Sequence, residues 1–309
     1  MDFKGADILT TKQFSREDLE KIMGVARGLE KYALKQETSE LLKGYVMASL
    51  FYEPSTRTRF SFETAMNRLG GKVITAVGME FSSLYKGETL HDTGKMMENY
   101  VDVIAMRHPE KGSVDEVARA AEVPVINAGD GPGQHPTQAL LDLYTIYVEQ
   151  GKVDGLKIAL SGDLKYGRTV HSLCVLLGHY DVELVFVAPE ELKMPEKITN
   201  YLDEHGVKYT ETEDFDGAIR DGVDVLYCTR IQKERFTDKS EYERLKSVFV
   251  LDKAKAMTGK SDMTIMHPLP RVGEIAEDVD ELAGAAYFRQ ARNGIAVRMA
   301  LLAMVLGKV

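Results

Sequence analysis

The sequence contains 309 residues, enough for one large domain or two ordinary ones. Its hydrophobic content of 44% and charged content of 28% are typical of a soluble globular protein. The net charge of -9 argues against a general nucleic-acid-binding surface. If the protein binds an anion, the anion must bind at a local basic cluster within an acidic surface.

Two further features bear on the compartment. No apolar run reaches the length that a membrane-spanning helix needs, and the first residues lack the pattern of a signal peptide. Cys174 and Cys228 both lie within apolar runs, which is typical of reduced thiols in a protein core. We therefore expect a cytoplasmic protein without a membrane partner.

The first half of the chain alternates between short apolar runs and segments whose apolar residues have helical spacing. This alternation predicts βα units and a parallel sheet. The expected strands cover residues 45–51, 72–77, 101–106 and 123–127. The expected helices cover residues 15–34, 60–69, 90–100 and 113–122. Residues 78–89 fit neither periodicity and are expected to form a mobile loop with a glycine hinge.

A largely apolar helix at 139–150 and a glycine-bounded turn at 151–155 precede a second βα series. Its expected strands cover residues 156–160, 182–187, 223–228 and 263–266. Its expected helices cover residues 169–178, 196–205 and 288–306. The chain is therefore expected to be an α/β protein of two similar lobes. Each lobe would be a parallel β-sheet flanked by helices, with the active site in the cleft between them.

The stretch Ser55-Thr56-Arg57-Thr58-Arg59 lies where the strand at 45–51 turns into a helix. The first N–H groups of a helix have no internal partner and the helix dipole is positive there, so this position favours anions. The hydroxyl and guanidinium groups add donors that match phosphate. The alternative is a Ser/Thr helix cap beside two solvated arginines, but the close alternation of hydroxyl and arginine favours a phosphate site.

Other polar residues follow neighbouring strands of the same predicted sheet. Arg107 follows the strand at 101–106, and a glycine-rich turn after the next strand leads to His135 and Gln138 at a helix start. Ligands of open parallel sheets collect at the carboxyl ends of the strands, so we expect these residues beside the phosphate site. His135 alone could be a helix-capping histidine, but the convergence of three polar strand ends favours a binding role.

In the second half, Gly162 to Thr169 nearly matches the phosphate-binding loop Gly-x4-Gly-Lys-Ser/Thr, with Arg168 in place of the lysine. Because the planar guanidinium suits a carboxylate, we interpret Arg168 as a carboxylate anchor. The residues that share this anchoring role in the second half are Arg168, Arg230, Gln232 and Arg271.

No set of residues has metal-ligand spacing, and no nucleophile elbow or Ser–His–Asp pattern is present in the sequence. We therefore expect chemistry by positioning and charge stabilisation, without a metal, a cofactor or a covalent intermediate. A phosphate site and carboxylate anchors together predict group transfer from a phosphorylated small molecule to an anionic acceptor, with phosphate leaving.

Seven motifs resemble the aspartate/ornithine carbamoyltransferase family, and the resemblance runs essentially from end to end. They are STRTR at 55–59, KGE at 86–88, RHP at 107–109, HPTQ at 135–138, GDLKYGRTVH at 162–171, TRIQKER at 229–235 and HPLPR at 267–271. The first and fourth are shared across the family. The last two are similar to the aspartate-specific members, because an ornithine enzyme would be expected to show His-Cys-Leu-Pro in the last.

The resemblance implies transfer of the carbamoyl group of carbamoyl phosphate to the amine of L-aspartate, a committed step of pyrimidine biosynthesis. It implies these carbamoyl phosphate ligands: Ser55, Thr56, Arg57, Thr58, Ser82, Arg107, His135, Gln138, Pro268 and Leu269. It implies these aspartate ligands: Lys86, Arg168, Arg230 and Gln232. The implied catalytic residues are Arg57, Thr58, Lys86, Arg107 and His135. Of these, Thr58, Arg107 and His135 would donate to the carbamoyl oxygen.

Further expectations follow from the same resemblance. Residues 1–134 with 288–309 would bind carbamoyl phosphate, residues 151–287 would bind aspartate, and residues 135–150 would form an interdomain helix. Glu53 would pair with Arg168 and Arg235 when the lobes close, and Arg59 would hold the phosphate site in shape. No cofactor is implied.

The resemblance also implies partners. Ser82 and Lys86 would reach into the site of a neighbouring subunit in a homotrimer, with Ser83 as an alternative to Ser82. Residues 110–122 lie where some relatives contact a zinc-containing regulatory chain, so a regulatory partner is left open. The alternative functions are an ornithine carbamoyltransferase, a non-catalytic sensor of small anions and a nucleoside triphosphatase.

Overall fold

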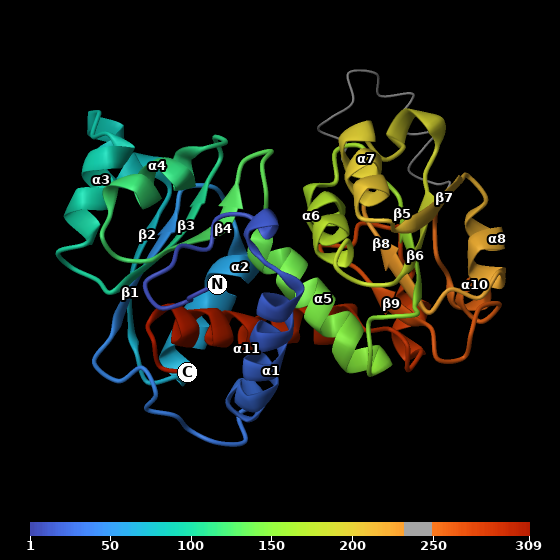
Figure 1. Cartoon of the computed structure of the whole chain (residues 1–309), viewed down its shortest axis with the longest axis horizontal. Helices are drawn as coiled ribbons and strands as arrows, with labels where there is room; N and C mark the ends of the chain where they lie inside the picture. Colours follow the sequence, from blue (N-terminus) through green and yellow to red (C-terminus); the bar gives the residue numbers. More distant parts are fainter. Residues whose placement is uncertain (232–248) are drawn as a thin grey trace. The chain divides into compact units, whose positions relative to one another are not determined.

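The computed structural model describes residues 1–231 and 249–309. The chain forms two compact units, Met1–Leu141 with Ala291–Val309, and Asp142–Gln290. The chain passes from one unit to the other within helices α5 (Pro136–Gln150) and α11 (Tyr287–Val305). Both units contain a parallel sheet flanked by helices (Figure 1), so the predicted α/β class is confirmed.

The first unit is built on a four-stranded sheet in the order β2-β1-β3-β4. Its strands are β1 (Val46–Phe51), β2 (Lys72–Val77), β3 (Val103–His108) and β4 (Val125–Asp130). Its other helices are α1 (Arg16–Ala33), α2 (Thr56–Arg68), α3 (Leu90–Met97) and α4 (Ser113–Ala120), with the short 3-10 helices η1 (Thr11–Gln13), η2 (Met79–Phe81) and η3 (Ser83–Lys86).

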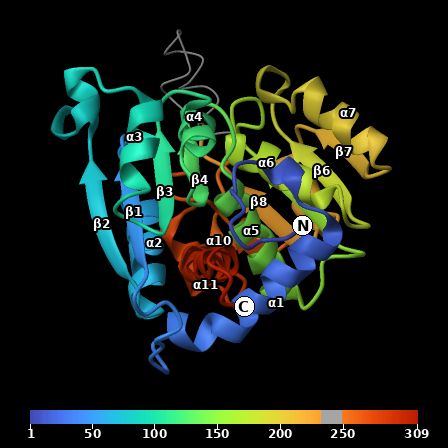
Figure 2. The same ribbon diagram turned by 60° about the vertical axis from the view of Figure 1, so that its left-hand side comes forward.

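The strand order fixes which face each helix covers. The chain moves one way from β1 to β2 and the opposite way from β3 to β4. Because βαβ crossovers are right-handed, α2 covers one face, and α3 and α4 cover the other. In agreement, α2 contacts β1 and β2, α4 contacts β3 and β4, and α3 packs on α4 (Figure 2). The inner strands are therefore buried, whereas β2 is a largely exposed edge strand.

In the second unit, the described strands have the order β7-β6-β5-β8-β9 and are all parallel. They are β5 (Lys157–Ser161), β6 (Glu183–Val187), β7 (Lys208–Thr212), β8 (Val225–Cys228) and β9 (Thr264–Met266). The helices are α6 (Arg168–Leu177), α7 (Glu196–Glu204), α8 (Phe215–Arg220) and α10 (Lys253–Ala256), with η4 (Glu190–Leu192) and η6 (Glu277–Glu281).

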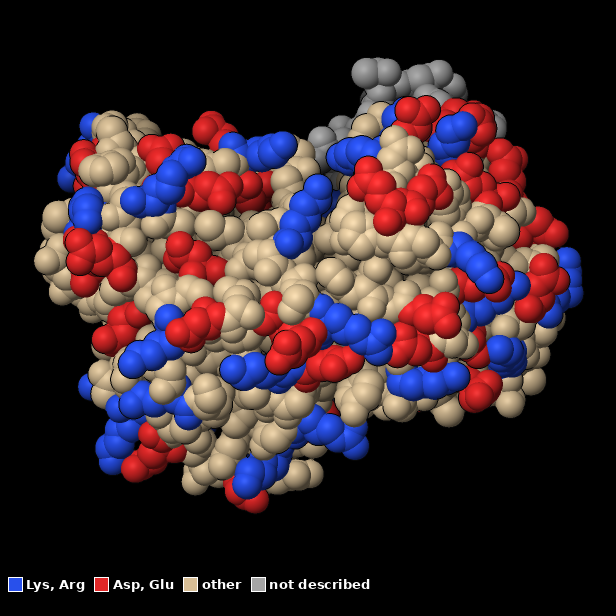
Figure 3. Space-filling model, in the orientation of Figure 1, with Lys and Arg blue, Asp and Glu red and all other residues tan. Residues whose placement is uncertain are grey.

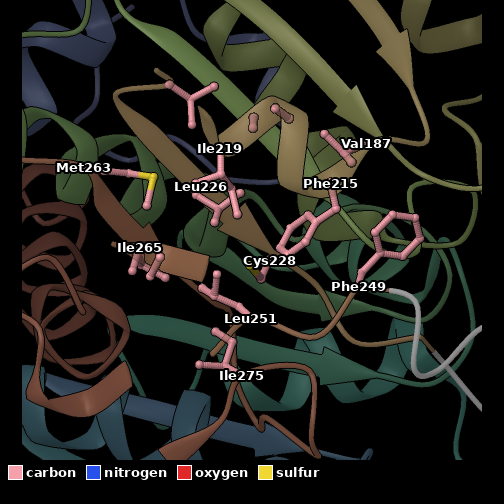
Figure 4. Packing of buried hydrophobic residues seen from close by; sticks show 14 of the residues in the cluster. Val187, Phe215, Ile219, Leu226, Cys228, Phe249, Leu251, Met263, Ile265 and Ile275 are labelled. Atoms are coloured by element: carbon pink, nitrogen blue, oxygen red, sulfur yellow. The ribbon is translucent and has the colours of Figure 1, made fainter. Parts of the chain in front are cut away.

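One face of the second sheet packs into a hydrophobic core (Figure 4). Phe215 of α8 and Phe249 meet edge to face, with ring centroids 5.8 Å apart. Leu226 and Cys228 of β8 and Ile265 of β9 are buried in the same cluster. Burial raises the pKa of the Cys228 thiol, which fits the expected reduced core cysteine.

Most predicted elements agree with the structure to within a few residues, with two kinds of difference. The second predicted helix begins at Thr56, so the Ser55–Arg59 stretch forms its first turn. The elements β7, α8 and α10 were not predicted, and the segment expected to be a loop contains η2 and η3.

The surface agrees with the prediction, made from the net charge of -9, that the protein has no general nucleic-acid-binding surface. On the face drawn in Figure 3, acidic and basic side chains are interspersed and form no continuous basic surface. No helix among the described residues is long and apolar enough to cross a membrane.

Candidate active site

The first turn of α2 is electrostatically unusual. It contains no acidic residue, although acids stabilise helix N-termini, and it carries Arg57 and Arg59 instead. Ser55 occupies the N-cap position in extended backbone, but its side chain makes no capping hydrogen bond. The structure therefore does not support the interpretation of Ser55 as a simple helix cap. Positive side chains at the positive end of a helix indicate a site for an anion.

This turn lies at a topological switch point of the first sheet. Strands β1 and β3 are neighbours, and Phe51 pairs with Arg107 at their carboxyl ends. The chain leaves β1 toward β2 but leaves β3 toward β4, so the two connections run to opposite faces. Ligands of open α/β sheets bind at such points. The strand order thus brings the Ser55–Arg59 turn and Arg107 together.

The charge of Arg107 acts on Arg57. Partial burial and the nearby charge of Arg107 lower the pKa of Arg57. Burial also lowers the pKa of Arg107, although the carboxylate of Glu53 acts in the opposite direction. An anion bound between the two guanidinium groups would stabilise the charged form of Arg57.

Arg107 is held from two sides. Its Nε lies 2.8 Å from Oε2 of Glu53, with which it forms an ion pair. On the other side, the register of β3 and β4 shifts between Met106 and His108, which is typical of a bulge. Gly129 in the bulge has φ +133°, and an added Cβ would lie 3.0 Å from Nη1 of Arg107. This support is not predicted from the sequence, although glycine within a strand often marks such a close approach.

His135 and Gln138 follow β4, whose carboxyl end lies at the same edge of the first sheet as the ends of β1 and β3. The loop after β4 is tied to β3 because the N–H of Gly131 donates to the carbonyl of His108 at 2.8 Å. His135 is buried just before α5, and its carbonyl accepts the N–H of Gln138 at 3.0 Å. The structure thus places both residues on the predicted edge of the sheet.

Arg59 differs from Arg57 in its contacts. Its Nε lies 3.7 Å from Oε1 of Glu63 within the same helix. That carboxylate also accepts hydrogen bonds from Ser49 of β1 at 3.0 Å and Thr75 of β2 at 3.1 Å. Arg59 therefore belongs to a polar network that ties α2 to the sheet, as expected for a structural residue.

The segment after β2 carries Ser82 and Lys86. The Ser82 hydroxyl donates to the carbonyl of Met79 at 2.8 Å, whereas Ser83 is exposed. Lys86 is exposed at the end of η3, and Gly87 ends that helix with φ 90°. Within this chain, the Ser82 hydroxyl is used to hold the turn.

The second sheet has its own switch point, between β5 and β8. Ser161 pairs with Cys228, and the chain leaves these strands in opposite directions. Gly162 has φ +108°, and a Cβ there would lie 2.3 Å from the carbonyl oxygen of Thr229. The two loops therefore lie against each other, and they lead to Arg168 at the start of α6 and to Arg230.

The remaining predicted residues either follow β9 or lie outside the described part of the chain. Pro268 and Leu269 follow β9, the strand that pairs with β8. Arg271 forms an ion pair with Asp280 at 2.5 Å and lies over the Tyr287 ring, which indicates a structural role in place of the predicted ligand role. Gln232 and Arg235 lie outside the described residues.

Within residues 1–231 and 249–309, no group of three His, Cys, Asp or Glu side chains is placed to hold a metal ion.

Two parallel α/β units with arginines at their switch points define a two-domain α/β protein suited to small anions. The family model described as "Aspartate/ornithine carbamoyltransferase, carbamoyl-P binding domain" matches residues 6–148. The model described as "Aspartate/ornithine carbamoyltransferase, Asp/Orn binding domain" matches residues 154–305. The chain belongs to the aspartate/ornithine carbamoyltransferase family, and it is a carbamoyltransferase.

Several similar proteins are aspartate carbamoyltransferases by name. The aspartate carbamoyltransferase catalytic subunit of Leptospira biflexa is 54% identical over 301 residues, covering 97% of this chain and 96% of the relative. A crystal structure of aspartate transcarbamoylase from Trypanosoma cruzi in complex with carbamoyl phosphate and aspartate has a TM-score of 0.91 and 43% identity, covering 98% of each chain. The catalytic subunit of M. jannaschii aspartate transcarbamoylase has a TM-score of 0.92 and 48% identity, covering 97% of this chain and 98% of the other.

Proposed function

We propose that this chain transfers the carbamoyl group of carbamoyl phosphate to L-aspartate, giving N-carbamoyl-L-aspartate and phosphate. The observation that carries the proposal is the convergence of Arg57 and Arg107 at the first switch point, which suits a phosphate. The family relation supports both substrates, since the similar Trypanosoma cruzi enzyme was crystallised with carbamoyl phosphate and aspartate. The product places the reaction in pyrimidine biosynthesis.

In the proposed reaction, the aspartate amine attacks the carbamoyl carbon, a C–N bond forms and the bond from carbon to the phosphate oxygen breaks. The carbonyl oxygen gains negative charge in the transition state, and Thr58, Arg107 and His135 donate hydrogen bonds to it. Ser55, Thr56 and Arg57 hold the phosphate together with Thr58 and Arg107. The departing phosphate accepts the proton that the amine loses, so no side chain needs to act as a general base.

The second unit is proposed to supply the aspartate site. Arg168 and Arg230 bind the two carboxylates, because a guanidinium group matches a carboxylate in two parallel hydrogen bonds. Gln232 is assigned the same role from the sequence alone. The carbamoyl amide is held by Gln138 and by the backbone carbonyls of Pro268 and Leu269.

Glu53 is proposed to change partners during the cycle. In the structure it forms an ion pair with Arg107, with 2.8 Å between Oε2 and Nε. When substrates bind, Glu53 pairs with Arg168 and Arg235 in the closed enzyme. Arg107 is then available to the phosphate and the carbonyl oxygen.

We also propose a homotrimer in which Ser82 and Lys86 complete the site of a neighbouring subunit. The edge strand β2 leaves apolar side chains in solvent, which supports a protein partner there. The large apolar residues exposed on β2 and the following segment are Ile74, Val77, Met79 and Tyr85. Whether a regulatory chain contacts residues 110–122 is left open, and a cytoplasmic location stays a prediction.

Subunit mixing tests the shared site. The variants Lys86→Ala and Arg57→Ala are each expected to be inactive as pure trimers. After exchange of equal amounts, about one quarter of the sites should combine an intact Arg57 with an intact Lys86, and activity should return in proportion. Sedimentation confirms the trimer, and native mass spectrometry of the mixture confirms the exchange. Exchange without recovered activity would show that Lys86 acts within its own subunit or not at all.

Steady-state assays of the purified chain test the reaction itself. Carbamoyl phosphate with aspartate should yield carbamoyl aspartate and phosphate in equal amounts. Product formation from carbamoyl phosphate with ornithine, but not with aspartate, would identify an ornithine enzyme. The cationic side chain of ornithine would be repelled by Arg230, so we do not expect this result. Binding of carbamoyl phosphate without turnover would identify a sensor, and ATP hydrolysis independent of carbamoyl phosphate would identify a nucleoside triphosphatase.

A further inference from the structure

The turn after β9 is organised by a buried imidazole. His267 is 1% exposed, and its Nδ1 accepts the N–H of Leu269 at 2.8 Å. A ring nitrogen that accepts a backbone N–H cannot carry a proton, so the proton is on Nε2. Nε2 accordingly donates to Oε1 of Glu274 at 2.7 Å. The imidazole therefore bridges the two sides of the turn as a neutral ring.

The imidazole is itself fixed by its surroundings. The backbone N–H of His267 donates to Oε1 of Gln290 at 2.9 Å, and Gln290 donates to Oδ1 of Asp142 at 2.6 Å. The other oxygen of Asp142 accepts the hydroxyl of Tyr227 in β8 at 2.8 Å. Glu274 is held as well, because its Oε2 accepts the N–H of Val272 at 3.0 Å. Such a connected network fixes the ring in one orientation.

This arrangement determines where the carbonyl of Pro268 points. The N–H of Leu269 and the carbonyl of Pro268 belong to one planar peptide group, in which they point in opposite directions. Fixing the N–H on His267 therefore turns the carbonyl of Pro268 away from the buried ring. Leu269 has φ 58°, which is unfavourable for a residue with a side chain, so the turn needs such support.

We propose that His267 and Glu274 are positioning residues that hold the carbonyl of Pro268 in the orientation that receives the carbamoyl amide. This inference rests on the proposed function. Neither side chain touches the substrate. They act on the backbone, and the backbone distinguishes an amide group from groups that cannot donate a hydrogen bond.

Two substitutions of His267 separate its contacts. In His267→Asn, the side-chain oxygen lies near the former Nδ1 and can still accept the N–H of Leu269. In His267→Gln, the amide reaches toward Glu274 but leaves no acceptor near Leu269. We expect His267→Gln to weaken carbamoyl phosphate binding about tenfold, as for one lost hydrogen bond, and His267→Asn to weaken it less.

Acetyl phosphate is the matched probe, because it carries a methyl group in place of the carbamoyl NH2. Calorimetry or competition binding should show that His267→Gln leaves the affinity for acetyl phosphate unchanged, so that the preference for carbamoyl phosphate falls. Equal losses for both ligands, or equal effects of the two substitutions, would overturn the proposal. If His267→Gln does not fold, Glu274→Gln should give a smaller loss of the same preference, and an unchanged preference would overturn the proposal.

The wild-type chain separates this inference from the proposed function. Without turnover of carbamoyl phosphate and aspartate by the wild type, the proposed function fails. With normal turnover and an unchanged ligand preference in the variants, only the inference about His267 and Glu274 fails.

Discussion

In the first unit, Arg57 and Arg107 converge at the junction of β1 and β3, and the charge of Arg107 lowers the pKa of Arg57. In the second unit, the turn after β9 is held by a neutral imidazole, a carboxylate and backbone hydrogen bonds. The first arrangement is costly until an anion binds, whereas the second is satisfied within the protein. Substitution of Arg57 should therefore weaken ligand binding without loss of stability, whereas substitution of His267 or Glu274 should reduce both.

Arg57→Ala is the strongest test of this difference. It should lower turnover by about 10²- to 10³-fold and abolish phosphate binding, because it removes a charged donor to the leaving group. The urea midpoint should stay the same or rise, because the repulsion by Arg107 is relieved. Steady-state kinetics, phosphate titration and urea unfolding measure these effects. Near-normal turnover would remove Arg57 from the site.

Arg59→Ala is the matched control from the same helix turn. Its ion pair with Glu63 is partly exposed, so its loss should cost about 0.5 kcal/mol of the free energy of unfolding. Turnover should fall far less than in Arg57→Ala. Equal losses of turnover in the two variants would contradict the division between a ligand-binding and a structural arginine.

Gly129→Ala tests the support of Arg107 and should have a smaller effect. The new Cβ would press on the guanidinium of Arg107, and φ +133° strains any residue with a side chain. We expect turnover to fall about tenfold and the free energy of unfolding to fall by about 1–3 kcal/mol. Gly44→Ala is the control, because Gly44 has φ +92° and open space around it. It should lose stability but keep full turnover.

Glu274→Gln tests the second unit through its pH dependence. Burial alone would raise the pKa of Glu274, but the hydrogen bonds from His267 and from the backbone N–H of Val272 lower the pKa below the ordinary 4.5. A carboxylate with a lowered pKa stabilises the fold above its unfolded pKa, and this stabilisation is lost as pH falls through the folded pKa. The variant should be about 1 kcal/mol less stable at neutral pH. Urea unfolding should show the difference shrinking below pH 4.5; a constant difference would exclude an ionised Glu274.

Periodicity predicted the helices and strands whose apolar residues recur at helical or strand spacing. The first turn of α2 was not recognised because Thr56 to Arg59 offers no apolar residue, and the helical spacing begins only at Phe60. Strand β7 was missed because Lys208–Thr212 is a polar edge strand that is not covered on both faces. Tertiary pairing, and not local propensity, defines both elements.

The candidate site also contains residues that the sequence predicts and residues that only the tertiary structure reveals. Arg57 and Arg107 could be predicted because each lies at a strand end, and strand ends share one edge of a parallel sheet. That these two ends are neighbours depends on the order β2-β1-β3-β4, which the sequence does not reveal. The roles of Gly129 and of the pair His267 and Glu274 depend on backbone geometry within turns, which no periodic pattern marks.

The chain order of the two units has a consequence for biosynthesis. Residues from Ala291 onward belong to the first unit, although the whole second unit is encoded before them. Among them is Arg298, which is buried, donates to Ser61 of α2 at 2.7 Å and to Thr137 of α5 at 3.5 Å, and lies over the ring of Phe62. On the ribosome, the helices that carry Arg57 and Gln138 are made long before this partner emerges. The unit whose synthesis begins first is therefore the last to complete its core.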